Sequence, residues 1–414
     1  MNFLKASILS GIATIIKLGS GLIINKIIAM YIGPAGVALI GQFQNCFNII
    51  VTIGNGAINQ GVTKYVAEYH EVDNAKRDRY ISASFIITFL ISILLGIVIF
   101  LFSNHLSMLV FKSDDYYVVF RVLATTLLFI GLNSVILSLI NGLKRIRLFV
   151  LVNICGSLLG LIFTTVLTMK FEVWGALLST VLVQTLLFFI SFVVCIKRLK
   201  IQFKFNINIP QIYYKKLFSF SLMAIVAVIS VSLSQLMIRN HIIDNFSIDY
   251  AGYWQAIWMI STMYLTILTT AFATYYLPTL SKLEDPVQIR QEILAGYKII
   301  VPFVFLSAAS MYFMRDIIIM LLFTPDFYPM RELFLYQFVG DFFKMCSWLV
   351  AYLMIAKSMT KSYIATEIIF ALLFYVLTVI LTEANGLIGV VQAHAINYFI
   401  YMIVVYFITR KWIK

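Results

Sequence analysis

Charged residues are scarce in this chain of 414 residues: Asp, Glu, Lys and Arg make up only 12%, about half of their share in a typical soluble domain. Apolar residues make up 62%. A soluble fold of this composition would have too few polar side chains to cover its surface. The sequence therefore excludes a soluble globular protein and indicates one whose surface is largely in contact with lipid.

Motifs of catalytic and nucleotide-binding sites are also missing. The polar segments contain no phosphate-binding loop, no HExxH, no GxSxG and no paired carboxylates. The four cysteines show neither metal-ligand nor disulfide spacing; they are Cys46, Cys155, Cys195 and Cys346. We therefore predict that the chain is not an enzyme and that it holds no metal and no cofactor.

Apolar stretches of roughly 20 residues, long enough to cross a bilayer core as a helix, recur along the whole chain. We predict twelve spans, at residues 6–32, 36–60, 80–103, 117–141, 147–170, 173–196, 217–239, 250–276, 296–323, 332–356, 362–382 and 386–409. The first is too long for a signal peptide and is expected to remain in the mature protein. The predicted fold class is an all-α membrane protein.

Basic residues are distributed unevenly between the loops on the two sides of the predicted membrane. Of the 31 Lys and Arg residues, 22 fall on the side of the N-terminus and six on the opposite side. Because cytoplasmic loops are enriched in Lys and Arg, both termini are predicted to be cytoplasmic. The net charge of +13 therefore reflects topology and does not indicate nucleic-acid binding.

The chain divides into two halves of six predicted spans. The basic segment 201–216 separates a lobe of residues 1–200 from a lobe of residues 217–414. Both halves begin and end in the cytoplasm, so a repeat would be related by an axis along the membrane normal, with a central cavity between the lobes. A shift of 214 positions aligns Ser7 with Ser221, Ala13 with Ala227, Ser20 with Ser234, Leu22 with Leu236 and Ile28 with Ile242.

Several cations lie inside the predicted spans, where a central charge costs about 2.5–3.5 kcal/mol on insertion scales. Lys17 is near the middle of the first span, at the limit of a lysine's reach to the surface, and is predicted to face the cavity. Asn25 and Lys26 lie nearer the periplasmic end, and the shift places Asn25 on Arg239. For Lys26 and Arg239 two interpretations remain open, a cavity position and snorkelling to the headgroups.

Two further polar sets lie on single helix faces. In the second span, Gln42 and Asn45 begin a stripe that either contacts substrate or holds helices together by hydrogen bonds. In the tenth span, Asp341 and Lys344 are three residues apart. They either neutralise each other as an ion pair or provide a proton or cation site for coupled transport.

Several short motifs resemble those of one transporter family. They are Gly33-Pro34-Ala35-Gly36, GVTKYVAEYHE from Gly61 to Glu71, GYWQ from Gly252 to Gln255, YLPTL from Tyr276 to Leu280, VGDFFK from Val339 to Lys344 and IAK from Ile355 to Lys357. By the order and spacing of these motifs, the chain resembles the O-antigen and enterobacterial-common-antigen flippases of the multidrug/oligosaccharidyl-lipid/polysaccharide exporter superfamily.

The resemblance implies a two-lobed, alternating-access transporter of the bacterial inner membrane. Its substrate would be an undecaprenyl-pyrophosphate-linked oligosaccharide of lipopolysaccharide O-antigen biosynthesis. Its partners would be membrane lipids and the polymerase and chain-length regulator of that pathway. The residues predicted to bind substrate are Lys17, Asn25, Lys26, Gln42, Asn45, Arg239 and Gln255, and those predicted to couple transport to an ion are Asp341 and Lys344. A lysine ammonium is a suitable point charge for a pyrophosphate.

Two other kinds of protein remain as alternatives. A multidrug or cation antiporter of the same superfamily would share the fold, but it is expected to have acidic cavity residues, whereas the deep charges here are mostly basic. A membrane-embedded polysaccharide polymerase or ligase is an enzyme that usually has a large periplasmic loop. No predicted periplasmic loop here exceeds about 13 residues.

Overall fold

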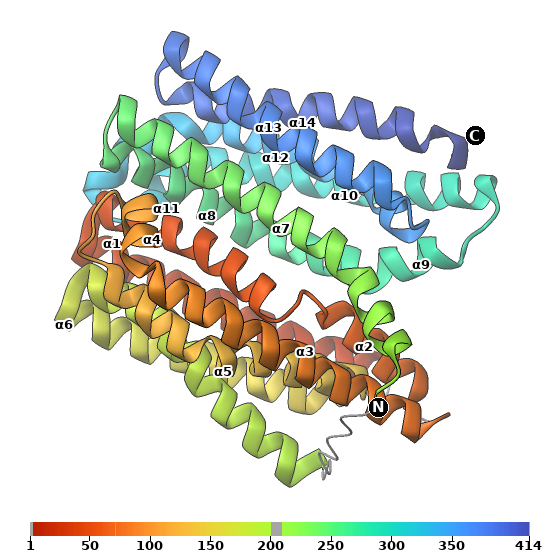
Figure 1. Cartoon of the computed structure of the whole chain (residues 1–414). Coiled ribbons are helices and arrows are strands. Elements are labelled where there is room, and N and C mark those ends of the chain that lie inside the picture. The colour runs from red at the N-terminus through yellow and green to blue at the C-terminus, as the bar shows by residue number, and fades with distance from the viewer. Residues whose placement is uncertain (1–2, 71, 200–208, 414) are drawn as a thin grey trace. The chain divides into compact units, whose positions relative to one another are not determined.

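The computed structural model describes residues 3–70, 72–199 and 209–413, and nearly all of them are helical (Figure 1). No strand occurs among these residues. Glu71 of the predicted family motif and residues 201–208 of the predicted basic segment 201–216 lie outside the described residues. The expected all-α fold is confirmed.

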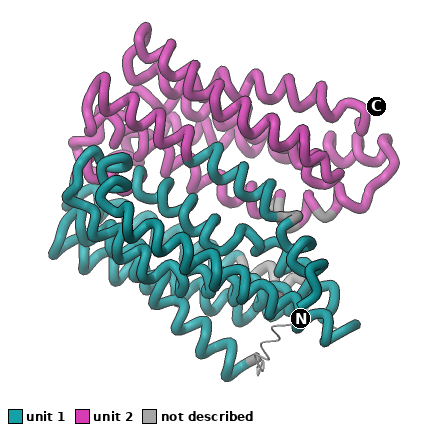
Figure 2. Tube along the Cα trace, viewed as in Figure 1, with its two compact units in different colours: residues 1–32, 42–232 teal, residues 33–41, 233–414 magenta. Residues whose placement is uncertain are grey.

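Two compact units make up the chain (Figure 2). Unit 1 comprises residues 1–32 and 42–232, and unit 2 comprises residues 33–41 and 233–414. Two helices, α1 (Phe3–Gly54) and α7 (Gln211–Asn245), contribute residues to both units. The units differ from the predicted lobes chiefly in the assignment of these two helices.

In unit 1, the helices α3, α5 and α6 pack side by side, and α2 lies against α3 and α5. The helices of this unit after α1 are α2 (Asn59–Tyr69), α3 (Asn74–Leu101), α4 (Ser103–Phe111), α5 (Tyr117–Gly142) and α6 (Ile146–Val194), which continues into the π-helical turn Cys195–Leu199. Most of α2 falls within the predicted loop 61–79. Its buried face is formed by Val62, Tyr65 and Val66, at the spacing of an amphipathic helix.

In unit 2, the helix α12 packs against α8, α10 and α14. The helices after α7 are α8 (Ile248–Ala271), α9 (Leu277–Lys282), α10 (Pro286–Phe313), α11 (Arg315–Leu322), α12 (Phe334–Ala356), α13 (Thr360–Asn385) and α14 (Ile388–Thr409), with a π-helical turn at Phe272–Tyr276 and 3-10 segments at Pro325–Leu333 and Arg410–Trp412. The ninth predicted span was wrong at its start, because α10 begins at Pro286. Asp285 caps this helix by accepting a hydrogen bond from the Val287 N–H at 3.1 Å, and hydropathy does not detect such a polar first turn.

Both α1 and α6 contain a residue with non-helical backbone angles. In α1 this residue is Gly33, with φ 68°, directly before Pro34. Glycine adopts this left-handed region without steric cost, and proline, which has no N–H to donate, is well suited to begin the next helix. The break expected at the Gly33–Gly36 turn is confirmed. In α6 the corresponding residue is Glu172, with φ 49°.

The same order of helices occurs twice along the chain. We count α1 and α6 as two long segments each. In both halves of the chain, two long segments are followed by a short helix, which is α2 in the first half and α9 in the second. A third long segment and a second short helix, α4 or α11, come next, and three long segments complete each half. Backbone details recur at the 214-residue shift that the sequence indicated. Glu172 and Gly386 have φ values of 49° and 61°, and Lys144 and Ser358 have φ values of 55° and 53°.

Close helix contacts also recur at this shift. A Cβ atom on Gly175 would lie 1.9 Å from the carbonyl oxygen of Leu167, and one on Gly389 would lie 2.3 Å from that of Leu381. Each glycine therefore permits the same tight turn between two antiparallel segments. The internal repeat predicted from the first and seventh spans is thus present in the backbone.

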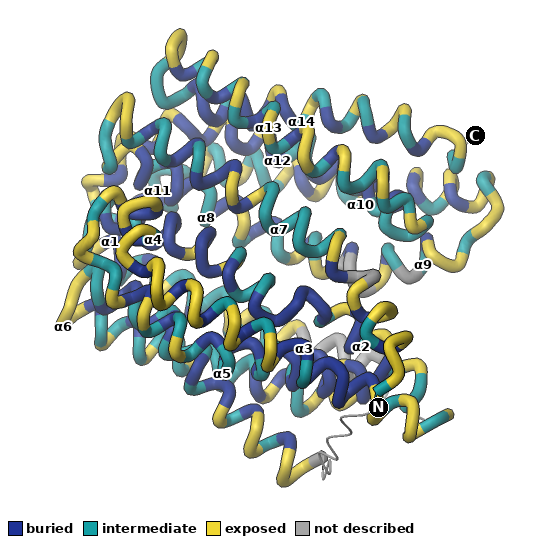
Figure 3. The backbone as a smooth tube through the Cα atoms, viewed as in Figure 1, coloured by how far each residue is buried: buried dark blue, intermediate teal, exposed yellow. Residues whose placement is uncertain are grey.

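Nine helical segments in the described part of the chain are long and apolar enough to cross a membrane. Two of them, Gly11–Gly54 with 44 residues and Ile146–Arg198 with 53, are about twice the length that one crossing requires and contain the breaks described above. Large apolar side chains are exposed along the long helices, such as Leu94 on α3 at 70% and Ile299 on α10 at 73%. Exposed positions recur along the helices (Figure 3). The chain is a multi-pass membrane protein, and the number of twelve crossings remains a prediction.

Candidate functional site

Arg239 on α7 is one of the largest fully buried side chains of the molecule, with only 1% of its surface exposed. Its Nη2 donates a hydrogen bond to Oε1 of Gln255 on α8. The guanidinium carbon lies 5.3 Å from the ring centre of Trp254, which is also fully buried. The structure thus brings two of the predicted substrate-binding residues, Arg239 and Gln255, into contact within unit 2.

Two glycines allow residues 33–41 to pack closely on α8. A Cβ on Gly252 would lie 2.0 Å from the carbonyl oxygen of Pro34, and a Cβ on Gly41 would lie 2.4 Å from Cδ of Gln255. Without a side chain at Gly41, the amide of Gln255 has room to reach Arg239. These contacts give a physical role to the glycines of the GYWQ and Gly33–Gly36 motifs.

The charge of Arg239 has no opposite charge beside it in the described chain. Its Nε and Nη1 have no hydrogen-bond partner, and neither has Nε1 of Trp254. Ion pairs within the described residues do not include Arg239. An unpaired buried cation is costly, and a guanidinium with free N–H groups matches the geometry of phosphate oxygens. The arrangement is therefore a candidate anion site.

A second polar cluster of unit 2 surrounds the buried carboxylate of Asp341 on α12. Its Oδ2 accepts hydrogen bonds from Ser261 and from the hydroxyl of Tyr264, the latter at 2.9 Å. Its Oδ1 lies 3.4 Å from Nε2 of Gln337 and 3.2 Å from Nε2 of His394 on α14. All these side chains are buried, so the cluster joins α8, α12 and α14 through one carboxylate.

The expected ion pair between Asp341 and Lys344 is not formed in the described structure. Four other groups surround the carboxylate, and the ammonium of Lys344 lies instead among three aromatic rings. Its Nζ is 5.3 Å from the ring centre of Trp258, 5.2 Å from that of Trp348 and 5.5 Å from that of Tyr398. Helical spacing permitted the pair, but the aromatic residues of neighbouring helices offer the ammonium a closer set of contacts.

The remaining predicted site residues lie in unit 1, on α1. Lys17 is exposed, Lys26 is half-buried, and Asn25 is buried with 7% exposure. Gln42 and Asn45 are also buried, with 1% and 8% exposure. The cavity that these residues are expected to share with Arg239 remains a prediction.

Sequence reasoning missed the residues that complete both clusters of unit 2. His394 is a histidine inside a predicted span, and an intramembrane ionisable residue is by itself a signal of a functional site. Trp254 and Trp258 showed no signal beyond their aromatic character, because their positions beside Arg239 and Lys344 depend on the packing of α8. No group of metal-ligating side chains occurs among the described residues, and all four cysteines are free.

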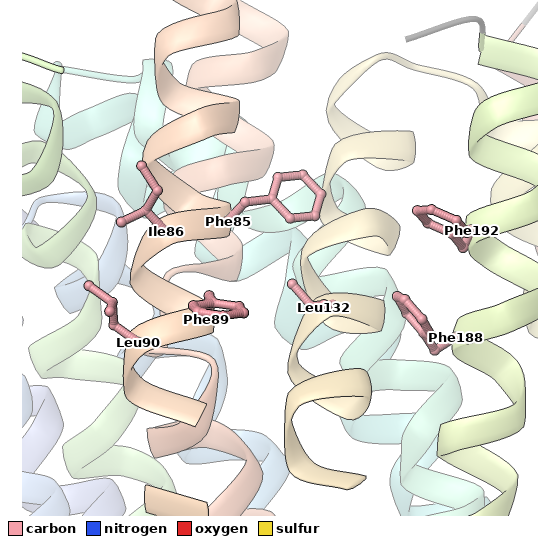
Figure 4. A pocket seen from close by; sticks show the side chains of 7 residues that line it. All are labelled: Phe85, Ile86, Phe89, Leu90, Leu132, Phe188 and Phe192. Carbon is pink, nitrogen blue, oxygen red and sulfur yellow. The ribbon is translucent and has the colours of Figure 1, made fainter. Parts of the chain in front are cut away.

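Unit 1 contains a cavity of about 420 Å³ between α3, α5 and α6 (Figure 4). Seven apolar side chains line it: Phe85, Ile86, Phe89, Leu90, Leu132, Phe188 and Phe192. It includes none of the predicted site residues and has no group that would recognise a phosphate. The polar clusters of unit 2 are therefore the better candidate site.

Comparison with known proteins agrees with this arrangement. Residues 3–284 match the family described as polysaccharide biosynthesis protein. The chain is 31% identical over 410 residues to the Lipid III flippase of Escherichia coli (strain K12), covering 97% of this chain and 96% of the relative. This relative confirms the resemblance to flippases that the sequence motifs indicated.

Solved structures show the same fold at lower identity. An inward-facing multidrug resistance MATE family transporter of the MOP superfamily aligns with a TM-score of 0.81 at 15% identity, over 97% of this chain and 98% of the other. The lipid II flippase MurJ in an inward closed conformation aligns with a TM-score of 0.75 at 18% identity, over 98% of this chain and 87% of the other. By its fold, and by a family match that covers most of its length, the chain belongs to the polysaccharide biosynthesis protein family.

Proposed function

We propose that the chain is a flippase that moves a lipid-linked oligosaccharide from the cytoplasmic to the periplasmic leaflet by alternating access. The observation that carries this proposal is Arg239: a buried guanidinium whose free N–H groups have no anion beside them in the described chain. The pyrophosphate of a polyprenyl-linked sugar is an anion whose oxygens can accept hydrogen bonds from these N–H groups. The 31% identity to the Lipid III flippase supports the same function.

Further residues are proposed to assist Arg239 in binding the substrate. Gln255 accepts a hydrogen bond from Nη2 of the guanidinium and leaves Nε and Nη1 without a partner. Lys17 and Lys26 are proposed to supply additional positive charge, and the amides of Asn25, Gln42 and Asn45 are proposed to bind polar groups of the substrate; these five residues come from α1.

Asp341 is proposed to couple transport to a proton or another cation. Its support is the buried contact with His394, whose second ring nitrogen, Nδ1, is buried without a hydrogen-bond partner. A histidine in contact with a carboxylate is a pair of groups that can share or pass on a proton. Lys344 is close enough in sequence to influence this pair through its charge, although it does not contact the carboxylate.

The cellular setting is part of the proposal. We place the protein in the bacterial inner membrane with both termini in the cytoplasm, on the basis of the distribution of basic residues. The pathway is proposed to be O-antigen or related polysaccharide synthesis. The polymerase and the chain-length regulator of that pathway would then act on the translocated product.

Deletion of the gene tests the proposed function directly. In spheroplasts of the deletion strain, lipid-linked oligosaccharide should accumulate and should be protected from a membrane-impermeant glycosidase added outside. The wild-type gene should reverse this protection, and a gene with Arg239→Met should not. Absence of any accumulated lipid-linked sugar, together with increased sensitivity to cationic drugs, would instead favour the multidrug exporter.

A further inference from the structure

The apolar cavity of unit 1 has a buried floor and an exposed edge. Phe85 and Phe188, at the floor, are 7% and 8% exposed, whereas Phe89 and Leu90, at the edge, are 48% and 62% exposed. The helices α3 and α6 each pack on α5, and the cavity lies between them at Leu132 of α5 (Figure 4). Its edge therefore continues into the surface that contacts the hydrocarbon of the membrane.

A hydrocarbon chain is the ligand that this cavity fits. All of the side chains that line it are apolar, so they offer no hydrogen bond to water or to a polar ligand. The volume of about 420 Å³ lies in the range of small-molecule sites and has room for a chain of many methylene groups. Around a membrane-spanning protein, such chains belong to lipids.

The depth of the cavity corresponds to one leaflet of the bilayer. On α3 the lining residues lie between Phe85 and Leu90, six to eleven residues beyond Arg79. At the helical rise per residue, the cavity extends from about 9 to about 17 Å from Arg79, and one leaflet contributes about 15 Å of hydrocarbon. On α6, Lys197 follows the lining residue Phe192 by five residues. A lipid with a chain in the cavity therefore has its headgroup near the level of Arg79 and Lys197.

Positive charge is concentrated at this level. Arg79, Lys197 and Arg198 are exposed, and within the described residues no ion pair includes them. Arg79 donates a hydrogen bond of 3.4 Å to the hydroxyl of Tyr213, which does not neutralise its charge. The other two cations at the start of α3 are already paired with carboxylates. The three remaining cations can therefore bind an anionic headgroup.

We propose that the cavity binds one acyl chain of an anionic phospholipid, such as phosphatidylglycerol, and that Arg79, Lys197 and Arg198 hold its headgroup. The bound lipid connects α3 to α6 across α5 and so stabilises unit 1. The proposal does not depend on the substrate, because none of the predicted substrate-binding residues lines the cavity. The prenyl chain of a transported lipid suits the site less well, since it would leave the cavity in every cycle.

Photolabelling of the purified full-length protein in phosphatidylcholine nanodiscs tests the site. The nanodiscs contain a small fraction of a phospholipid with a diazirine in one acyl chain, either phosphatidylglycerol or phosphatidylcholine, and mass spectrometry identifies the labelled residues. Leu372 and Val376, exposed on α13, serve as the reference for bulk lipid. Relative to them, phosphatidylglycerol should label residues 85–90 and 188–192 at least about tenfold more strongly than phosphatidylcholine, as expected for charge-assisted contacts.

One pair of double variants tests the role of charge. Lys197→Gln with Arg198→Gln should remove most of the preference for phosphatidylglycerol, because the cations are lost and the cavity is kept. The matched control, Arg290→Gln with Lys298→Gln, removes two exposed cations of α10 and should leave the preference unchanged.

A second kind of variant tests the role of the cavity. Leu132→Trp places an indole in the space of the acyl chain, and Ile86→Trp does so from α3 if the first variant fails to fold. Either change should reduce the labelling of residues 188–192 by phosphatidylglycerol to the level of the reference residues on α13.

Three results would contradict the proposal. Equal labelling by the two lipids would show that the cations do not select the headgroup, and unchanged labelling of the filled-cavity variants would show that the chain lies elsewhere. Loss of the label on addition of undecaprenyl phosphate, at a concentration at which unlabelled phosphatidylglycerol has no effect, would assign the cavity to a prenyl chain. None of these results would contradict the proposed flippase function.

Discussion

Arg239 combines a cost to the fold with a use in function. A guanidinium that is 1% exposed and has no anion beside it within the described chain is destabilising in the absence of ligand. Replacement by a methionine of similar length removes the buried charge but also the anion-binding group. Stability and export should therefore respond in opposite directions.

We expect Arg239→Met to raise the thermal unfolding temperature of the ligand-free protein in detergent and to reduce export of lipid-linked oligosaccharide at least about tenfold, the loss typical of a charged hydrogen bond. Arg239→Lys should retain partial export, because the charge remains and the fork geometry is lost. Arg290→Met, at an exposed arginine of α10, is the matched control and should change neither quantity. A drop in both stability and export would show that Arg239 is structural.

Asp341 is expected to couple energetically to His394 rather than to Lys344. Asp341→Asn weakens four hydrogen bonds around a buried carboxylate and should destabilise the protein by about 1.5–3 kcal/mol. The same change should cost less when His394 has already been replaced by leucine, because the two side chains are in contact. Unfolding temperatures of the single variants and of two double variants, Asp341→Asn with His394→Leu and Asp341→Asn with Lys344→Met, give both coupling energies. A larger coupling of Asp341 to Lys344 would restore the ion pair that the sequence suggested.

At the scale of elements, the break in α6 differs from its repeat counterpart in one respect. Glu172 has φ 49° and ψ −127°, backbone angles that residues other than glycine rarely adopt. The equivalent residue in the second half, directly after α13, is Gly386, with φ 61° and ψ −147°. The N-terminal half therefore carries strain that the C-terminal half avoids. Such strain typically costs about 1–3 kcal/mol.

Substitutions at the two breaks test this difference in backbone strain. Glu172→Gly should stabilise the protein by about 1 kcal/mol or more, because glycine adopts the observed angles without strain. Glu172→Ala keeps the Cβ atom and should give no such gain, which makes it the matched control. Gly386→Ala should destabilise. Thermal unfolding in detergent measures all three, and equal stability of the glycine and alanine variants at position 172 would argue against backbone strain there.

For the whole molecule, the main prediction concerns topology. The same order of helices in the two halves of the chain, α1 to α6 and α7 to α14, agrees with two halves that each begin and end on the same side of the membrane. Reporter fusions within residues 200–210 should be active only as cytoplasmic reporters, and fusions near Asp244 only as periplasmic ones. The opposite result at either position would contradict the twelve-span topology and the parallel relation of the halves.

The sequence by itself determined the class of the protein, the positions of most helices and the period of the internal repeat. These properties depend on hydropathy, charge and turn residues, which act locally along the chain, as the break at Gly33-Pro34 illustrates. Polar helix starts were the main error at this level. Pro286 begins α10 well before the apolar run because a capping side chain, and not hydropathy, sets that boundary.

Only the tertiary structure decided which polar groups meet. Asp341 and His394 are separated by 53 residues, and the rings around Lys344 come from three helices, so no local pattern could pair them. The sequence singled out Arg239, Gln255, Asp341 and Lys344 because charge and amide groups are expensive in a membrane. Whether each group is paired, caged by aromatic rings or left free for a ligand depends on helix packing, which brings together side chains that are distant in the sequence.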